Sequence, residues 1–213
     1  MTADSLNRRL VPRLEALSIS LTDEEIRLLG EYWSLLARWN TKVNLTALSL
    51  DGYPTESVDR LILEPLLAVR AVPPDPITWF DLGSGGGSPA IPIKITRPEA
   101  ALVMVESRSR KAAFLREVVR SLGLRATQVE NERFERIAEQ QPGVADCITV
   151  RAVRPDENLL ATVKSLLKDS GRMILFETPE SSQDLPGFAA IDEIRSDALR
   201  IRIRVIVPRG TND

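Results

Sequence analysis

Residues 78–89 read Thr78-Trp79-Phe80-Asp81-Leu82-Gly83-Ser84-Gly85-Gly86-Gly87-Ser88-Pro89, and this stretch decides the fold. An apolar segment runs directly into a glycine-rich turn. Glycine lacks a Cβ, so the backbone can turn tightly there and lie close to a ligand. Pro89 suits the first turn of a following helix, where its missing N–H would be unpaired anyway. The stretch therefore predicts a strand, a ligand-binding turn and a helix, with the turn at the carboxyl edge of a sheet.

Outward from this turn, strands and helices alternate along the chain. Short apolar runs predict strands at 77–82, 101–106, 127–131, 145–150 and 172–177, and helices at 89–96, 109–122, 134–140 and 157–167. Gly123 and Gly171 stand where helix C-caps or turns belong. This order predicts an α/β fold, Rossmann-like, with a mostly parallel and doubly wound sheet. The alternating tail at 199–207 predicts a half-exposed strand, paired with 191–195 in a hairpin at one edge.

The first 72 residues have a different character and are expected to form an N-terminal helical cap. Thr22 and Glu25 match a capping box, and an apolar stripe at helical spacing follows as far as Trp39. A second amphipathic helix is predicted at 57–70, before a proline-rich linker at 73–76. The chain is thus expected to comprise a cap (1–72) and a core (77–213). Trp39 ends the apolar stripe, which favours core packing over a place in a substrate wall.

Composition excludes several kinds of site. The chain of 213 residues has no histidine and one cysteine, Cys147, which rules out histidine-based triads, an intrachain disulfide and zinc sites of the common types. Cys147 falls in an apolar run and is expected to be buried in a strand. No segment approaches the roughly 20 apolar residues of a membrane span, and residues 1–13 lack the apolar region of a signal peptide. We therefore expect a cytoplasmic protein, monomeric, without membrane or metal partners.

Charge is unevenly distributed although the net charge is only −2. Six basic residues and one acidic residue, Glu117, lie between Arg108 and Arg125. This helix face is either solvated or a local phosphate-contacting surface.

The acidic residues around the turn indicate an adenosine cofactor. Asp81-x-Gly83-x-Gly85-x-Gly87 fits a methyltransferase loop, whereas the dinucleotide fingerprint GxGxxG would need glycine at Ser88. Asp81 suits a cofactor that bears an amine better than a pyrophosphate. Glu106 follows 25 positions later, at a strand end, where a carboxylate can accept both ribose hydroxyls. A glycine turn without a ligand is the remaining alternative.

Several further motifs resemble the RsmG (GidB) family, which methylates N7 of a guanine in 16S rRNA with S-adenosylmethionine. Residues 39–46 are similar to its WNxxxNLT segment and 81–92 to its DxGxGxGxPGIP loop. The segments Arg97-Pro98-Glu99, Glu106-Ser107, Arg110-Lys111 with Phe114-Leu115-Arg116, Arg133-Phe134-Glu135 and Val150-Arg151-Ala152 also resemble family motifs. The resemblance implies a class I methyltransferase fold and small-subunit rRNA as the partner.

Site residues follow from the loop and from this resemblance. The cofactor is expected to contact Asp81, Gly83, Gly85, Gly87, Ser88, Glu106, Phe134, Glu135 and Arg151. Phe134 has core packing as its alternative, and Arg151 has a substrate phosphate or a structural ion pair. Substrate contacts are expected from Asn40, Asn44 and Arg154. No catalytic base is assigned, because guanine N7 carries a lone pair and no proton, so that alignment dominates the reaction.

The chain also departs from the family pattern, mostly on the substrate side. The family's His-Ile-Leu-Asp-Ser is replaced by Leu61-Ile62-Leu63-Glu64-Pro65, and a lysine followed by glycine after the fifth strand is replaced by Glu177-Thr178. Ser88 and Ala90 replace a common leucine and a glycine. These changes leave open a methyltransferase that acts on another substrate, such as a small molecule. A non-catalytic binder of RNA or adenosine and an NAD enzyme are further alternatives.

Overall fold

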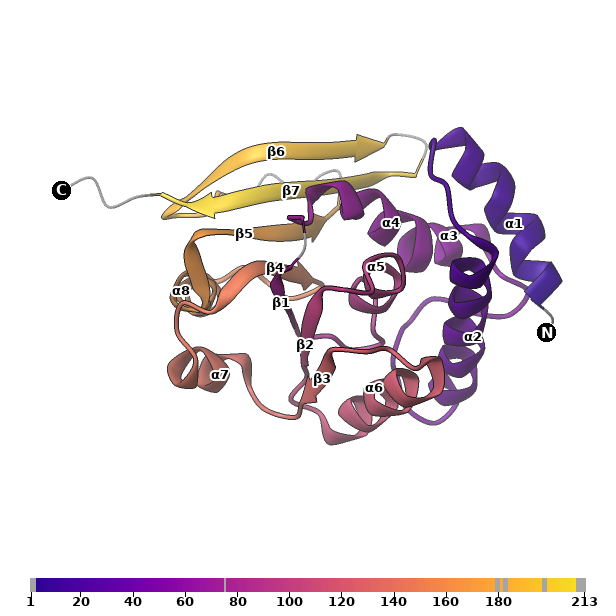
Figure 1. Ribbon diagram of the computed structural model, residues 1–213, viewed down its shortest axis with the longest axis horizontal. Coiled ribbons are helices and arrows are strands. Elements are labelled where there is room, and N and C mark those ends of the chain that lie inside the picture. Colours follow the sequence, from indigo (N-terminus) through magenta and orange to yellow (C-terminus); the bar gives the residue numbers. More distant parts are fainter. Residues whose placement is uncertain (1–2, 75, 179–180, 182–183, 197–198, 210–213) are drawn as a thin grey trace.

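The computed structural model describes residues 3–74, 76–178, 181, 184–196 and 199–209 (Figure 1). In this part of the chain seven strands form one sheet in the order β3-β2-β1-β4-β5-β7-β6. The strands are β1 (Thr78–Leu82), β2 (Ala101–Val105), β3 (Thr127–Glu130), β4 (Ala145–Arg151), β5 (Leu167–Glu177), β6 (Phe188–Ser196) and β7 (Ile201–Pro208). Strands β1 to β5 run parallel, and β7 is antiparallel to both β5 and β6. The mostly parallel sheet and the C-terminal edge hairpin are confirmed.

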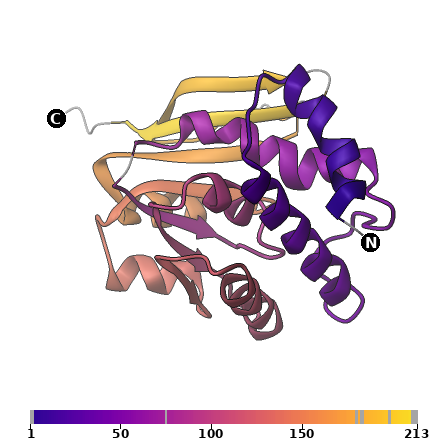
Figure 2. The same cartoon turned by 45° about the vertical axis from the view of Figure 1, so that its right-hand side comes forward.

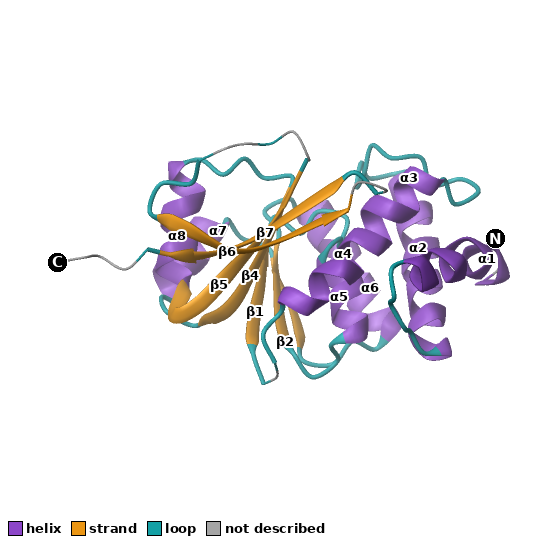
Figure 3. Cartoon of the chain, turned by 90° about the horizontal axis from the view of Figure 1, so that it is seen from above, coloured by secondary structure: helices purple, strands orange, loops and turns teal. Residues whose placement is uncertain are grey.

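Helices cover both faces of the sheet. The core helices are α5 (Ala90–Thr96), α6 (Ser109–Leu122), α7 (Phe134–Gln140) and α8 (Glu157–Leu166). Figure 3 shows α7 and α8 on one face, and α5 and α6 on the other together with the N-terminal helices. The doubly wound architecture is therefore confirmed. Its strand order reverses between β1 and β4, which creates a crevice at their carboxyl ends.

The two glycines predicted at helix ends behave differently. Gly123 caps α6 in the left-handed conformation at φ +63°, as predicted. Gly171 lies within β5, so the predicted turn there is wrong, as is the start of that strand at 172. The backbone becomes extended directly after Leu166 without a glycine cap. A Cβ at position 171 would lie 2.8 Å from the Ala145 carbonyl oxygen, so glycine serves here for the close approach of two strands.

The N-terminal region is helical, and its main helix begins where the sequence predicts. Helix α1 spans Ala3–Ala16 and α2 spans Asp23–Asn40. The Thr22 hydroxyl accepts a hydrogen bond from the Glu25 backbone N–H at 3.2 Å, and the Glu25 carboxylate accepts one from the Thr22 N–H at 2.6 Å. The predicted capping box is confirmed.

The second predicted helix of the cap, at 57–70, is not a single α-helix. It divides into α3 (Thr55–Val58), a π-helical segment (Asp59–Leu63), α4 (Glu64–Ala68) and a 3₁₀ turn (Val69–Ala71). The Glu64 N–H donates to the Asp59 carbonyl, five residues back. Because a π turn inserts one residue into the helical repeat, it rotates the following side chains relative to a regular helix. Hydrophobic spacing alone does not predict such a turn.

Cap and sheet share one hydrophobic core. A single cluster of buried side chains includes Leu10 and Trp33 from the cap and Trp79 and Ile174 from the sheet. Figure 2 shows α1 and α2, in indigo, lying outside the helices that cover this face. The division into a cap (1–72) and a core (77–213) stays a prediction. Positions 1–2, 75, 179–180, 182–183, 197–198 and 210–213 lie outside the described residues.

The predictions made for Trp39 and for Cys147 can be checked against this core. Trp39 is half-buried, with its ring centroid 5.8 Å from that of Phe114, so its predicted packing role is confirmed. Cys147 is fully buried in β4, as predicted, and burial raises the pKa of its thiol to about 12. None of the described helices combines the length and apolarity that a bilayer crossing needs.

Candidate active site

A pocket of about 990 Å³ opens at the carboxyl ends of β1, β2 and β4, with the cap as its opposite wall. This volume lies at the upper end of the range for small-molecule sites. Seven predicted cofactor-binding residues line it: Gly83, Gly85, Ser88, Glu106, Phe134, Glu135 and Arg151. The cap contributes Leu36, Leu45, Thr46, Leu48, Arg60 and Leu61. The structure therefore brings most of the predicted site together, opposite a wall that belongs to the N-terminal helices.

The glycine turn forms the floor of the pocket and is held from two sides. The backbone N–H groups of Gly83 and Ser84 donate to the Val105 carbonyl on β2 at 2.9 and 3.1 Å. From the cap, the buried Tyr32 hydroxyl donates to the Gly86 carbonyl at 2.8 Å. Gly87 lies just behind the lining, with φ +87°, and a Cβ there would come within 2.9 Å of Ile91. Glycine is required at position 87 by this packing, and the cap helps to shape the turn.

Glu106 joins β2 to the glycine turn. Its Oε2 accepts a hydrogen bond from the Gly85 N–H at 2.9 Å, and its Oε1 accepts one from the Arg108 N–H at 2.8 Å. The side-chain amide of Asn131 donates to the Glu106 carbonyl at 2.9 Å and fixes the backbone there. Each carboxylate oxygen has a second lone pair that these bonds do not use. The geometry is thus compatible with two hydroxyl donors from a bound sugar.

Asp81 lies beneath the turn and does not line the pocket. Its Oδ1 accepts a hydrogen bond from the Thr149 hydroxyl at 2.5 Å, while Oδ2 is buried without a partner among the described residues. Burial raises the pKa of this carboxyl to about 6, although the Thr149 hydroxyl bond opposes the shift. A buried acceptor without a donor is costly, so it marks a place where a ligand donor would be favourable. The predicted contact between Asp81 and a cofactor stays a prediction.

The start of α7 forms the side wall at Phe134 and Glu135. Phe134 packs against the hydrophobic cluster on the α7 and α8 face and also lines the pocket, so its two interpretations coexist. Glu135 forms a long ion pair with Arg133, with 3.6 Å between Oε2 and Nε. An apolar ring surface beside a carboxylate suits the flat face and the amino group of a purine.

Arg151 belongs to a polar network behind the wall that the cap forms. Its Nη2 lies 2.6 Å from Glu64 Oε2, and its Nη1 donates to the Ser88 hydroxyl at 2.9 Å. Ser88 in turn donates to the Leu61 carbonyl at 3.0 Å. The guanidinium also lies over the Phe176 ring, 5.8 Å from its centroid. Of the three roles left open for Arg151, a structural ion pair is therefore present.

Burial disfavours the charged forms of Glu64 and Arg151, and the ion pair between them offsets this cost. Glu64 has no exposed side-chain surface, and burial raises the pKa of its carboxyl while the charges of Arg151 and Arg60 lower it. Burial likewise lowers the pKa of the Arg151 guanidinium, and the Glu64 charge raises it. Replacing Glu64 alone would leave the buried Arg151 without its counter-ion, whereas replacing Arg151 would leave Glu64 paired with Arg60.

The three predicted substrate residues lie outside the pocket lining. Asn40 binds only nearby backbone groups among the hydrogen bonds of its side chain in the described residues. Its Oδ1 accepts hydrogen bonds from the N–H groups of Leu45 and Thr46 at 2.8 and 3.0 Å, and its side-chain amide donates to the Thr46 carbonyl. It therefore closes the turn that places Leu45 and Thr46 in the pocket. Asn44 and Arg154 are exposed at the surface. Their direct substrate role stays a prediction.

Sequence reasoning missed three residues that the structure places at the site, Tyr32, Arg60 and Glu64. Arg60 Nη1 lies 2.9 Å from Glu64 Oε1, four residues along the chain. That i, i+4 spacing of opposite charges was a readable signal. Tyr32 lies on the buried side of α2 and gives no comparable signal, because its partner is 54 residues away.

Comparison with known proteins places this site in a family. The family model GidB, rRNA small subunit methyltransferase G, matches residues 25–189. The chain belongs to the rRNA small subunit methyltransferase G family. The matched range contains most of α2, the glycine turn, Glu106, the start of α7 and Arg151, which together surround the pocket. The methyltransferase assignment expected from the sequence is confirmed.

Curated relatives that match this chain over most of their length carry the name of the same family. One from Stutzerimonas stutzeri is 32% identical over 202 residues, covering 94% of this chain and 90% of the relative. One from Chromobacterium violaceum is 32% identical over 186 residues, covering 85% of each. Both are named ribosomal RNA small subunit methyltransferase G.

Solved methyltransferase structures share the fold. The mitomycin 7-O-methyltransferase MmcR superposes with a TM-score of 0.59 at 16% identity, covering 84% of this chain and 60% of that one. A SAM-dependent methyltransferase from Aquifex aeolicus gives 0.55 at 13% identity, covering 72% and 92%. These likenesses confirm the class I methyltransferase fold.

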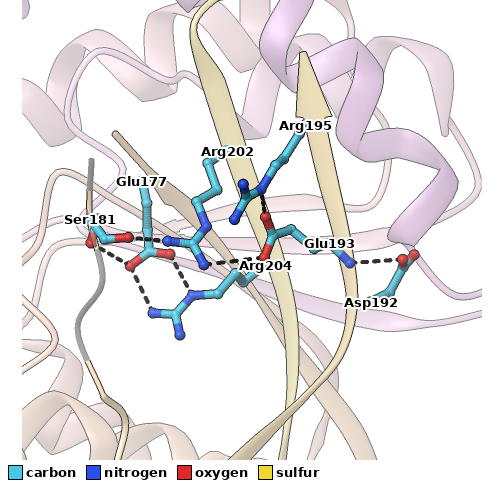
Figure 4. Close-up of polar contacts among 7 residues, drawn as sticks. All are labelled: Glu177, Ser181, Asp192, Glu193, Arg195, Arg202 and Arg204. Carbon is cyan, nitrogen blue, oxygen red and sulfur yellow. Dashed lines mark hydrogen bonds and ion pairs between the residues drawn. The ribbon is translucent and has the colours of Figure 1, made fainter. Parts of the chain in front are cut away.

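The charge of Glu177, where the resemblance to the family leads us to expect a lysine, is neutralised within this chain (Figure 4). Both Glu177 oxygens bind the Arg204 guanidinium, at 2.5 and 2.7 Å, and Oε1 also accepts from the Ser181 hydroxyl at 2.9 Å. Arg202 donates to the Ser181 carbonyl and pairs with Glu193 on β6. Glu177 does not line the pocket, so its carboxylate serves a local structural cluster at the edge of the sheet.

The basic run at 108–125 divides between the pocket and the solvent, and its contact with phosphates stays a prediction. Arg108 and Lys111 line the pocket, at the start of α6. Arg110, Arg120 and Arg125 are exposed, and Arg120 pairs with Glu117 at 2.6 Å. The solvated face is thus the far part of α6, and only the first turn faces the site.

Proposed function

We propose that this chain transfers the methyl group of S-adenosylmethionine to N7 of a guanine in small-subunit ribosomal RNA. The observation that carries the proposal is the pocket itself. One half of it consists of the glycine turn and the Glu106 carboxylate, which can accept hydrogen bonds from a ribose. The other half is the cap, whose pocket-lining residues lie within the range that the family model matches. The names of the curated relatives support the ribosomal substrate.

The residues present fit this cofactor. Gly83 and Gly85 leave backbone exposed at the pocket floor, and Glu106 keeps lone pairs for the two ribose hydroxyls. Phe134 offers a ring surface to the adenine, and Glu135 offers an acceptor to its amino group. The Asp81 carboxyl lies beneath this floor, buried and outside the pocket lining, so its contact with the amine of the methionine part stays a prediction. S-adenosylmethionine supplies an electrophilic methyl group on a sulfonium.

The proposed reaction needs no proton acceptor in the methyl-transfer step. Guanine N7 has a free lone pair, and as its bond to the methyl carbon forms, the carbon–sulfur bond breaks and its electron pair stays on sulfur. The positive charge moves from sulfur to the base. Histidine is absent from the sequence, in keeping with a site that works by alignment. The cap wall, with Leu45, Thr46 and Leu61, holds the base opposite the donor.

Transfer of labelled methyl groups tests this proposal. The chain is incubated with labelled donor and with small ribosomal subunits that lack the methyl group, and the product nucleoside is identified after digestion of the RNA. We expect label in 7-methylguanosine. Tight cofactor binding with no label in RNA would favour the same fold acting on another substrate. Stabilisation by NADH, with no stabilisation by S-adenosylhomocysteine, would refute the methyltransferase proposal itself.

A further inference from the structure

Two arginines share one buried carboxylate at the wall between the cap and the sheet. Glu64 pairs through Oε1 with Arg60 at 2.9 Å and through Oε2 with Arg151 at 2.6 Å. Two cations and one anion leave the group with a net charge of +1. The π-helical segment that carries Arg60 and precedes Glu64 lies in the cap, and π turns of this kind occur frequently at functional sites.

The two arginines differ in their exposure and in the number of partners that their guanidinium groups bind. Arg151 has 12% of its side chain exposed, and it binds Glu64 and Ser88 while its flat face covers Phe176. Arg60 has 27% exposed, lines the pocket, and binds the described residues only through Nη1 to Glu64. Because a guanidinium has five N–H donors, Arg60 keeps an edge for a ligand.

We propose that Arg60, oriented by Glu64, binds a backbone phosphate of the RNA at the target nucleotide. This inference rests on the proposed function, and it assigns Arg60 as a residue that positions the RNA, which is the methyl acceptor. The excess positive charge of the cluster suits an anion. Phosphate contacts of this kind fix the register of a nucleic acid without reading its sequence.

Arg60 is better suited to a phosphate than to the edge of the base. Methyl transfer makes the purine positive, so a guanidinium against the base would oppose the developing charge. A phosphate contact avoids that repulsion and leaves N7 free. The apolar cap residues Leu45, Leu48 and Leu61 line the same part of the pocket and suit the face of the base.

The experiment measures kcat/KM for unmethylated small subunits at several salt concentrations and constant magnesium, for the wild-type chain and Arg60→Gln. Each phosphate contact to a single strand contributes about 0.7 to the slope of log affinity against log salt. We expect Arg60→Gln to lower kcat/KM about tenfold, as for loss of a charged hydrogen bond, and to reduce the slope by about 0.7. The affinity for S-adenosylhomocysteine, from calorimetry, should stay within about twofold.

Two further variants make the result specific. Arg125→Gln removes the same charge from an exposed site outside the pocket lining and should leave the slope and kcat/KM unchanged. Arg60→Lys keeps the charge but lacks the second edge, so it should keep the slope and lose part of kcat/KM. It also decides the matter if Arg60→Gln does not fold.

An unchanged slope for Arg60→Gln, or an equal loss of S-adenosylhomocysteine affinity, would overturn the phosphate assignment. So would a reduced slope for Arg60→Lys, because lysine keeps the charge that a phosphate contact needs. Failure of the wild-type chain to methylate RNA at all would instead overturn the proposed function, and the two failures are thus distinguishable.

Discussion

Replacing Tyr32 by phenylalanine tests whether the cap shapes the cofactor turn. The Tyr32 hydroxyl is fully buried and donates to the Gly86 carbonyl at 2.8 Å, across 54 residues of sequence. The cap also approaches closely at Gly86 itself, where a Cβ would lie 3.2 Å from the Leu45 carbonyl oxygen. Phenylalanine keeps the ring and its packing, so that the change removes one hydrogen bond and little else.

The expected magnitude follows from the burial of this bond. A buried acceptor that loses its partner costs about 1–3 kcal/mol, because the ring that remains keeps water out. The free energy of unfolding should fall by that amount. The released turn must also be reordered when the cofactor binds. If half of the lost free energy, at most about 1.5 kcal/mol, reappears as weaker binding, the affinity for S-adenosylhomocysteine falls by up to slightly more than about tenfold.

Denaturant unfolding and isothermal calorimetry with S-adenosylhomocysteine measure the two effects. Tyr53→Phe is a matched control, because the sequence has only two tyrosines and both lie in the cap. Tyr53 is buried against Trp33, away from the glycine turn, and no hydrogen bond of its hydroxyl is found among the described residues. It should change the unfolding free energy and the affinity little.

Two results would refute the reasoning. If Tyr32→Phe unfolds like the wild type, the hydroxyl contributes no net stability to the turn. If its stability falls but its affinity for S-adenosylhomocysteine does not, the turn keeps its shape without the cap, and the proposed coupling of cap and cofactor is wrong.

Three other perturbations test the site and its surroundings. Glu106→Ala removes the acceptor of two backbone N–H groups and of the ribose, so we expect at least tenfold weaker S-adenosylhomocysteine binding by calorimetry, and a change below twofold would contradict the assignment. Burial raises the pKa of Asp81 to about 6, so the stability tied to its neutral form is present below the unfolded value of 3.8 and is lost as the pH rises through 6. Asp81→Asn should therefore gain about 1.4 kcal/mol in unfolding free energy relative to the wild type between pH 5 and pH 8, and a pH-independent difference would count against the shift. Arg204→Leu leaves buried Glu177 unpaired and should cost about 3 kcal/mol in denaturant unfolding, with methyl transfer retained in the folded fraction; Glu177→Leu together with Arg204→Leu should recover most of the loss.

The alternating architecture and the cofactor side of the pocket could be predicted from the amino-acid sequence alone. Its signals there are local: a strand that runs into Gly83, Gly85 and Gly87, an acid at the next strand end, and a capping box at Thr22. Local patterns of this kind depend on backbone sterics and on near neighbours, which a single segment contains. Gly171 marks the limit, since a strand contact and a helix cap both favour glycine.

The cap side of the pocket could not be predicted in this way, because long-range contacts set which of its side chains face the cavity. Asn40 and Arg60 both lie in the cap, yet the first closes a turn and the second faces the pocket. A π turn before Glu64 and contacts such as Tyr32 with Gly86 produce this arrangement. Such contacts join residues far apart in sequence, so no local propensity encodes them. They exist because the cap and the sheet bury one common core.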